Sequence, residues 1–192
     1  MVSTVRLVGA KQSGMTLIEV MVTLLILSIG LLGMAALQVR LQQSEMEAYQ
    51  RAQALLLLSD MANRIAANRN AAADYVTGAS SPVGVGSTCS TSTASRQDID
   101  LGEWCNALQG AAETTGSNAS KVGAMLGGRG CVESLGSNEY LITVAWQGEG
   151  PIAAPPASVA CGSGQYNGGT GSACANDLCR RVVTTIVRIA DL

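Results

Sequence analysis

The residues with the most evident chemistry are six cysteines, all in the second half of the chain: Cys89, Cys105, Cys131, Cys161, Cys174 and Cys179. An even number of cysteines in a glycine-rich region with few aromatic residues is typical of disulfides formed in an oxidising compartment. The sequence does not choose among the possible pairings. Zinc is the alternative ligand, but paired C-x-x-C spacings and histidine are both absent, so we predict no metal site.

Other kinds of site are excluded by residue type. The chain has no histidine, which removes Ser-His-Asp and Cys-His catalytic systems. Its glycine-rich stretches lack the strand, helix and lysine context of a phosphate loop, and Asp98, Asp100 and Glu103 lack a calcium-binding loop around them. A net charge of −2 without basic runs argues against nucleic acid as a partner. We therefore predict no catalytic residue, no cofactor and no enzymatic activity.

Glu19 is the one charged residue in an apolar run from Met15 to Val39. About 20 apolar residues span a bilayer, so this run is long enough to cross the inner membrane. Arg6 and Lys11 precede it without any acidic residue, which predicts a cytoplasmic N-terminus. A carboxylate in such a segment costs on the order of 2.5–3.5 kcal/mol. The alternative is a secretory signal cleaved near Ala36, which would have no use for Glu19.

Helical periodicity continues beyond the apolar run, and no proline interrupts the sequence from Met15 to Asn68. We expect one helix with a transmembrane half at residues 15–39 and an amphipathic half at residues 40–70. Small or apolar residues recur at spacings of three and four and are expected to face a globular head; they are Leu37, Leu41, Ser44, Ala48, Ala52, Leu55, Ala62 and Ile65. Gln50 and Gln53 fall on the opposite, outer side.

The remaining residues, 71–192, are expected to form an α+β head. Residues 98–108 read as a short helix with Trp104 in the core, started by a capping box of Asp100 and Glu103. Alternation predicts strands at Tyr140–Gln147, with one face buried, and at Arg181–Ile189; a short strand is expected to begin at Val132. The segment between the two long strands is either a recognition loop or an excursion clipped by disulfides.

Gly14 followed by "MTLIEV" resembles the class III signal of type IV pilins and pseudopilins. The resemblance implies a pilin-like roll, in which the long helix packs on a small antiparallel sheet. It also implies that prepilin peptidase cuts after Gly14, the end of a leader at residues 1–14, and methylates Met15. Glu19 would then pair with the new amine of a neighbouring subunit; the alternative is a carboxylate that reaches the lipid headgroups. Gly30 and Gly33 would let the helix melt locally, or pack closely.

Three further segments, "SIGLLGMAALQ", "VAWQG" and "CRRVVTTIV", are similar to minor pilins. This implies a protein that waits in the inner membrane and then primes pilus assembly at the tip and cell surface, with roles in twitching motility and adhesion. Its implied partners are other minor pilins, the major pilin, a tip adhesin and the inner-membrane assembly platform. The alternatives are a minor pseudopilin of a type II secretion system and, from another class, a membrane-anchored periplasmic enzyme or binding protein.

Overall fold

A computed structural model describes residues 14–111, 114–116, 120–121, 123 and 125–190; Arg6, Lys11 and the rest of the expected leader before Gly14 lie outside them. The described residues fall into two units, divided between Gln42 and Gln43. The elements are α1 (Leu17–Ala67), the 3-10 helix η1 (Arg69–Tyr75), β1 (Val83–Gly84), α2 (Arg96–Leu108), β2 (Thr114–Thr115), β3 (Ser120–Lys121), β4 (Arg129–Gly136), β5 (Glu139–Gln147) and β6 (Arg180–Arg188).

Helix α1 runs without a break through the apolar run and into the head. It contains a stretch long and apolar enough to cross a membrane, and none of that stretch is buried inside the structure. Large apolar side chains such as Leu17, Leu24 and Leu32 are therefore exposed on the isolated chain. An exposed surface of this kind needs lipid or other protein to cover it.

The part of α1 that belongs to the head buries a different face from the expected one. Its buried residues are Gln50, Ala54, Leu57, Leu58, Met61 and Ile65. Of the face predicted from periodicity, Ile65 is buried, but Ala48 and Ala52 are exposed and Leu55 is 46% exposed. The prediction failed because residues 54–58 are all apolar, so they present a hydrophobic surface in every direction and do not select a face.

Four strands form an antiparallel sheet in the order β1-β4-β5-β6. Strands β5 and β6 lie within one residue of their predicted bounds, whereas β4 begins at Arg129, before the expected Val132. Tyr140, Ile142, Val144 and Trp146 are buried on one face of β5, as alternation predicted. Thr143 and Ala145 on the other face are also inaccessible to solvent, which the alternation did not predict.

Helix α2 begins earlier than its acidic residues suggested. Ser95 is its N-cap, and the Ser95 side chain accepts a hydrogen bond of 3.0 Å from the backbone N–H of Asp98. The predicted capping box of Asp100 and Glu103 is therefore wrong. An uncharged serine competes well for this position because its short side chain reaches the free N–H groups of the first turn. Asp100 lies one turn inside the helix and is buried.

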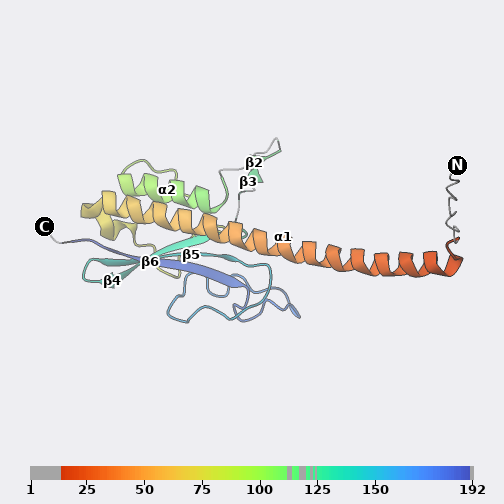
Figure 1. Cartoon of the computed structure of the whole chain (residues 1–192). Helices are drawn as coiled ribbons and strands as arrows, with labels where there is room; N and C mark the ends of the chain where they lie inside the picture. The colour runs from red at the N-terminus through yellow and green to blue at the C-terminus, as the bar shows by residue number, and fades with distance from the viewer. Residues whose placement is uncertain (1–13, 112–113, 117–119, 122, 124, 191–192) are drawn as a thin grey trace, which may run out of the picture. The chain divides into compact units, whose positions relative to one another are not determined.

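The core of the head is formed where the C-terminal part of α1 packs against α2 and the four-stranded sheet. Figure 1 shows α2 beside the C-terminal part of α1, with the four-stranded sheet on the other side of that helix. Trp104 of α2 is fully buried, and its indole N–H donates a 2.9 Å hydrogen bond to the carbonyl of Leu57 in α1. Gly130 of β4 lies so close to the Trp104 ring that a Cβ would overlap it. The predicted α+β fold, a long helix packed on a small antiparallel sheet with disulfides, is confirmed.

Three disulfides join the six cysteines as Cys89–Cys105, Cys131–Cys161 and Cys174–Cys179. The Cys131–Cys161 disulfide attaches residues 148–179, which contain no helix or strand, to β4. Tyr166 adds a second attachment, since its hydroxyl donates a 2.9 Å hydrogen bond to the carbonyl of Gly127. This long segment is therefore fixed on the outer face of β5, which explains why Thr143 and Ala145 are buried.

Replacing both Cys131 and Cys161 with alanine is expected to lower the free energy of unfolding of the head more than the same change at Cys174 and Cys179. Their sequence separations are 30 and 5 residues. On chain-entropy grounds the losses are about 3.5 and about 2 kcal/mol. Urea unfolding of the full chain in detergent measures both. Equal losses for the two double variants would contradict the role assigned to the longer loop.

Candidate functional site

The first candidate site is the beginning of α1. Thr16 directly precedes the helix, and the backbone N–H of Glu19 lies 3.1 Å from the Thr16 carbonyl and 3.4 Å from the Thr16 hydroxyl. Thr16 and Glu19 thus have the spacing of a capping box, in which a Ser or Thr cap is followed three residues later by Glu or Gln. We did not predict this motif, although its spacing can be read directly from the sequence.

The Glu19 carboxylate itself is exposed and has no ion pair within the described part of the chain. Met15, four residues earlier, is 70% exposed. A negative charge in the first turn of a helix is favourable because the helix dipole places partial positive charge there. The position therefore tolerates a carboxylate, and leaves its oxygen atoms free to meet a cation from another molecule.

Gly30 and Gly33 lie inside α1, and no other part of the described chain approaches them. A Cβ placed on either glycine would meet no atom within 4 Å. Close packing inside the chain therefore does not require glycine at these positions. Local melting of the helix and close packing against another chain both stay predictions.

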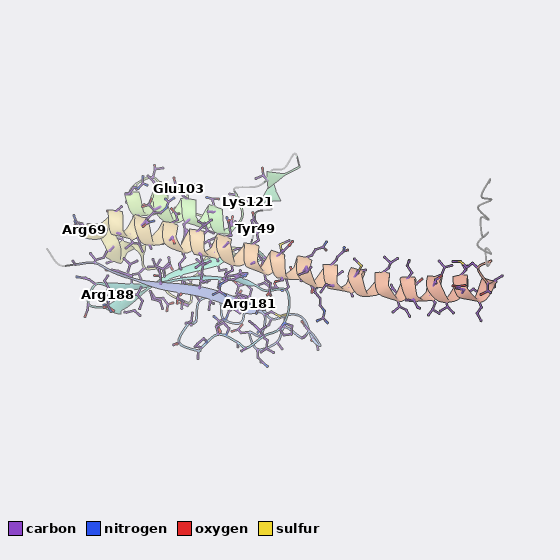
Figure 2. All side chains as sticks on the ribbon, viewed as in Figure 1. Tyr49, Arg69, Glu103, Lys121, Arg181 and Arg188 are labelled. Carbon is purple, nitrogen blue, oxygen red and sulfur yellow. A yellow bond between two sulfur atoms is a disulfide. The ribbon has the colours of Figure 1, made fainter. Side chains whose placement is uncertain are left out.

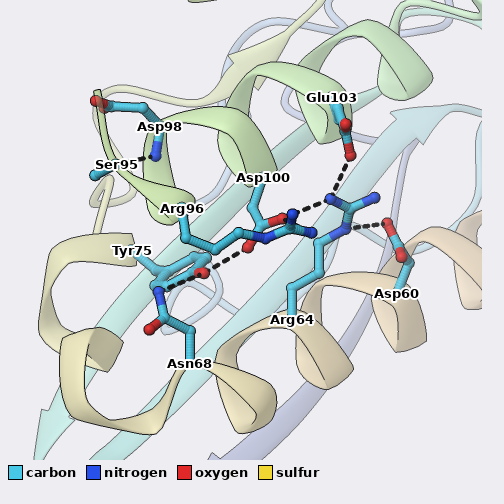
Figure 3. A network of polar contacts seen from close by, with 9 residues as sticks. All are labelled: Asp60, Arg64, Asn68, Tyr75, Ser95, Arg96, Asp98, Asp100 and Glu103. Atoms are coloured by element: carbon cyan, nitrogen blue, oxygen red, sulfur yellow. Dashed lines mark hydrogen bonds and ion pairs between the residues drawn. The ribbon is translucent and has the colours of Figure 1, made fainter. Parts of the chain in front are cut away.

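The second candidate site joins the end of α1 to α2 through one arginine (Figure 3). The Arg64 guanidinium lies 2.9 Å from the Asp60 carboxylate, 2.8 Å from that of Asp100 and 2.6 Å from that of Glu103. Asp100 also pairs with Arg96 at 3.0 Å and accepts a 2.6 Å hydrogen bond from the Tyr75 hydroxyl. Residues from α1, η1 and α2 thus depend on one another for their hydrogen-bond and ion-pair partners.

Asp100 is the central residue of the network, and its side chain is only 2% exposed. Burial alone would raise the pKa of Asp100, but hydrogen bonds from Tyr75 and Arg64 and the charges of Arg96 and Arg64 outweigh it. The pKa of Asp100 is therefore below its ordinary value. The carboxylates considered for calcium are thus engaged elsewhere: Asp100 and Glu103 bind arginine, and Asp98 accepts a 2.9 Å hydrogen bond from Ser92.

Asp100→Asn is expected to lower the free energy of unfolding by about 3 kcal/mol at neutral pH, because it leaves Arg64 and Arg96 without their shared buried carboxylate. A carboxyl with a lowered pKa stabilises the fold above its unfolded pKa of about 4 and loses this effect as the pH falls through its folded pKa. The difference between wild type and variant should therefore shrink below about pH 4. Denaturant unfolding at a series of pH values measures it.

The matched control is Glu103→Gln, because the Glu103 side chain is 57% exposed. Exposed ion pairs contribute little, so its loss should stay within about 1 kcal/mol at every pH. A large effect of Glu103→Gln, or an Asp100→Asn effect that persists unchanged in acid, would contradict the assignment.

A third feature is the exposed face of α1 within the head. Ala48, Ala52 and Leu55 follow one another at spacings of four and three, flanked by Tyr49 at 52% and Leu56 at 66% exposure. Small residues between larger apolar ones allow the close approach of a second helix. No described residue of the chain covers this face, so it is suited to contact with another chain.

Two models of known families match the chain, one at the beginning of α1 and one over the rest of α1 and α2. A model of the prokaryotic N-terminal methylation motif matches residues 9–35, which include Gly14, Met15 and Glu19. The model described as type IV pilin Tt1218 matches residues 36–115, which include the rest of α1, the Arg64 network and α2. The chain belongs to the type IV pilin family. No curated protein and no solved structure matches this pilin significantly.

Family membership fixes several general properties of this pilin. It is a component of a pilus or pseudopilus, and its apolar helix with the class III signal indicates membrane anchoring. Proteins of this family are structural, and the signal implies assembly partners in general. The exposed apolar surface of α1 therefore has an explanation, since a pilin helix is covered first by lipid and later by other subunits.

Proposed function

We propose that this pilin is a minor pilin of a type IV pilus that helps to start the filament and stays in its tip complex. The observation that carries the proposal is the position of Glu19 in the matched methylation motif, five residues after Gly14. The family signal supports cleavage after Gly14, which would leave a cationic amine on Met15. An exposed carboxylate and a new amine in the same short segment provide complementary charges for two adjoining subunits.

The energetic argument concerns what happens to these charges in an apolar environment. A lone ammonium or carboxylate surrounded by apolar helices is costly, whereas a close pair of opposite charge offsets much of that cost. A subunit would therefore be held in the growing filament only when its amine and a neighbour's Glu19 are in register. The surrounding exposed residues of α1 would provide apolar packing but little register, since an apolar surface has no direction.

The minor role rests on a finer likeness. The segments "SIGLLGMAALQ", "VAWQG" and "CRRVVTTIV" resemble the minor pilin PilV. On this basis the partners would be sibling minor pilins, the major pilin, a tip adhesin and the inner-membrane assembly platform, and the functions supported would be twitching motility and adhesion. The exposed face around Ala52 and Leu55 offers a contact surface for such a sibling.

The first test is the N-terminal residue of the protein isolated from cells, measured by mass spectrometry. We expect methylated Met15, because the resemblance of "GMTLIEV" to a class III signal supports a cut after Gly14. A mature protein that begins near Ala36 or Leu37, or an uncleaved Met1, would overturn the proposal.

The second test separates a pilus from a secretion system. Deletion of the gene is expected to reduce surface pili and twitching motility and to leave secretion of exoproteins unchanged. The opposite pattern would assign the chain to a type II pseudopilus. Complementation with the full-length gene should restore pili and serves as the control.

A further inference from the structure

The sheet has two edges, and they differ in how their backbone groups are satisfied. On the β4 edge, Gly130 pairs with Val83 of β1. The Val132 carbonyl accepts 3.0 Å hydrogen bonds from the N–H groups of Thr77 and Gly78, and the Val132 N–H donates to the Thr77 hydroxyl at 3.1 Å. A register shift between Ser134 and Gly136 ends regular pairing. These are ordinary ways of protecting a sheet edge.

The β6 edge is open, and the register shows which of its backbone groups are free. The Ile189 N–H donates to the carbonyl of Asn138, and the Gly148 N–H donates to the carbonyl of Cys179. The residues of each pair lie opposite each other on the two strand segments, so both are hydrogen-bonded pairs of the ladder. Bonded pairs alternate along an antiparallel ladder. The residues of β6 that bond β5 are therefore the odd-numbered ones, and the N–H and C=O groups of the even-numbered residues face outward; these are Val182, Thr184, Ile186 and Arg188.

No strand, loop or side chain in the described part of the chain bonds these outward groups. The usual protective devices are also missing from β6. It has 9 residues, contains neither proline nor glycine, and shows no register shift against β5. Its central residues, "VVTTIV", are all β-branched. A long, regular edge of this composition is suited to pairing with a further strand.

We propose that the β6 edge is a docking site for an extended segment of a different pilus subunit, which adds a fifth strand to the sheet and carries a carboxylate at the end that lies beside Arg188. Arginines stand at both ends of β6 (Figure 2), but Arg180 and Arg181 are mostly buried and pair with Asp177 and Glu47, whereas Arg188 is exposed. A second copy of β6 centred on Thr184 would place Arg180 opposite Arg188 and would supply no carboxylate there, because β6 has no acidic residue. The inference rests on the proposed function only for the identity of the partner.

The exposed side chains of β6 are compatible with such a partner. Ile186 is 49% exposed and Arg188 is 76% exposed, although Arg188 already contacts Glu139 at 2.8 Å. Backbone hydrogen bonds would provide affinity along the edge, and apolar contact with Ile186 together with a carboxylate near Arg188 would select the partner. Arg188 would thus favour an acidic strand over a second copy of β6, which has no acidic residue.

The test uses the full-length chain in detergent and a synthetic peptide as long as β6 (9 residues), made of alternating valine and threonine with a glutamate at each end. Residue-resolved amide exchange is the measurement. The peptide is expected to slow exchange at Val182, Thr184, Ile186 and Arg188 by about tenfold. Exchange at Val183, Thr185 and Val187 should not change, because β5 already bonds these amides.

Two variants make the test specific. Thr184→Pro removes one outward N–H, leaves the β5 ladder intact and should weaken peptide binding by about tenfold. Thr184→Ala keeps the N–H and should bind as wild type does. Protection that is absent, that falls on the inward amides, or that a peptide with arginine at each end produces equally would overturn the inference. Protection that rises with protein concentration alone would show self-pairing and overturn the choice of partner.

This experiment is independent of pilus assembly. A chain that is not cut after Gly14 but gives the expected protection would overturn the proposed function and leave the strand pairing intact. A methylated chain whose β6 amides gain no protection would do the reverse.

Discussion

Cells that express Glu19→Ala as their only copy of this pilin are expected to process the protein normally and yet to make about tenfold fewer pili, because in the proposed filament the buried amine of a neighbour would lose its partner. Gly14 and Met15 are unchanged in this variant, so the signal for cleavage remains. Electron microscopy gives the number of pili, and sheared fractions give incorporation. Normal piliation with the variant present in the filaments would contradict the proposed charge pairing.

The capping geometry provides a sharper comparison. Glutamine replaces glutamate in capping boxes without loss of the motif, but it carries no charge. Glu19→Gln should therefore keep the beginning of α1 intact and still fail in assembly. Thr16→Ala removes the side chain that accepts from the Glu19 N–H and should cost the helix about 1 kcal/mol while assembly continues. Glu45→Ala, an exposed change further along the same helix, is the matched control.

Trp104→Ala is expected to destabilise the head by roughly 3–5 kcal/mol, the usual loss for a large buried side chain. Trp104 has no exposed surface, donates to the Leu57 carbonyl and packs against Gly130. A loss of this size is a large part of the 5–15 kcal/mol typical of a folded domain, so we also expect faster proteolysis of the variant. Thermal unfolding of the full chain in detergent measures the effect.

The control for this prediction is Leu126→Ala, since Leu126 is a large apolar residue that is 59% exposed. Its removal should change the midpoint of unfolding little. Gly130→Ala tests the same contact from the other side, because its Cβ would overlap the Trp104 ring. If Gly130→Ala proved as stable as wild type, the close packing of α2 on β4 would be in question.

Local periodicity was sufficient for the elements that carry a strong signal. The β5 strand could be predicted because Tyr140, Ile142, Val144 and Trp146 alternate with smaller residues. The buried face of α1 could not, because four consecutive leucines conceal the period, and because Gln50 is buried with its side-chain oxygen unpaired among the described residues. Burial of a polar side chain depends on the tertiary packing around it, which a pattern of hydrophobicity does not contain.

The candidate sites also differ in how far the sequence alone could predict them. Gly14 and Glu19 were predicted from a short contiguous motif, which lies in the matched residues, and their roles in cleavage and assembly stay predictions. The Arg64 network was not predicted, because Asp100 contacts Arg64 from α2 and Tyr75 contacts Asp100 from η1, which are separate elements. The free edge of β6 required the strand order, since an edge strand and a central strand of this composition look alike in the sequence.

The three disulfides all lie between Cys89 and Cys179, and α1 contains no cysteine. The head is therefore cross-linked to itself but not to the helix on which it sits. Contacts between α1 and α2, such as Arg64–Asp100 and Trp104–Leu57, are noncovalent, so these two helices could separate without the breaking of any disulfide. Reduction of the disulfides should therefore loosen residues 89–179 and leave these contacts between the helices in place.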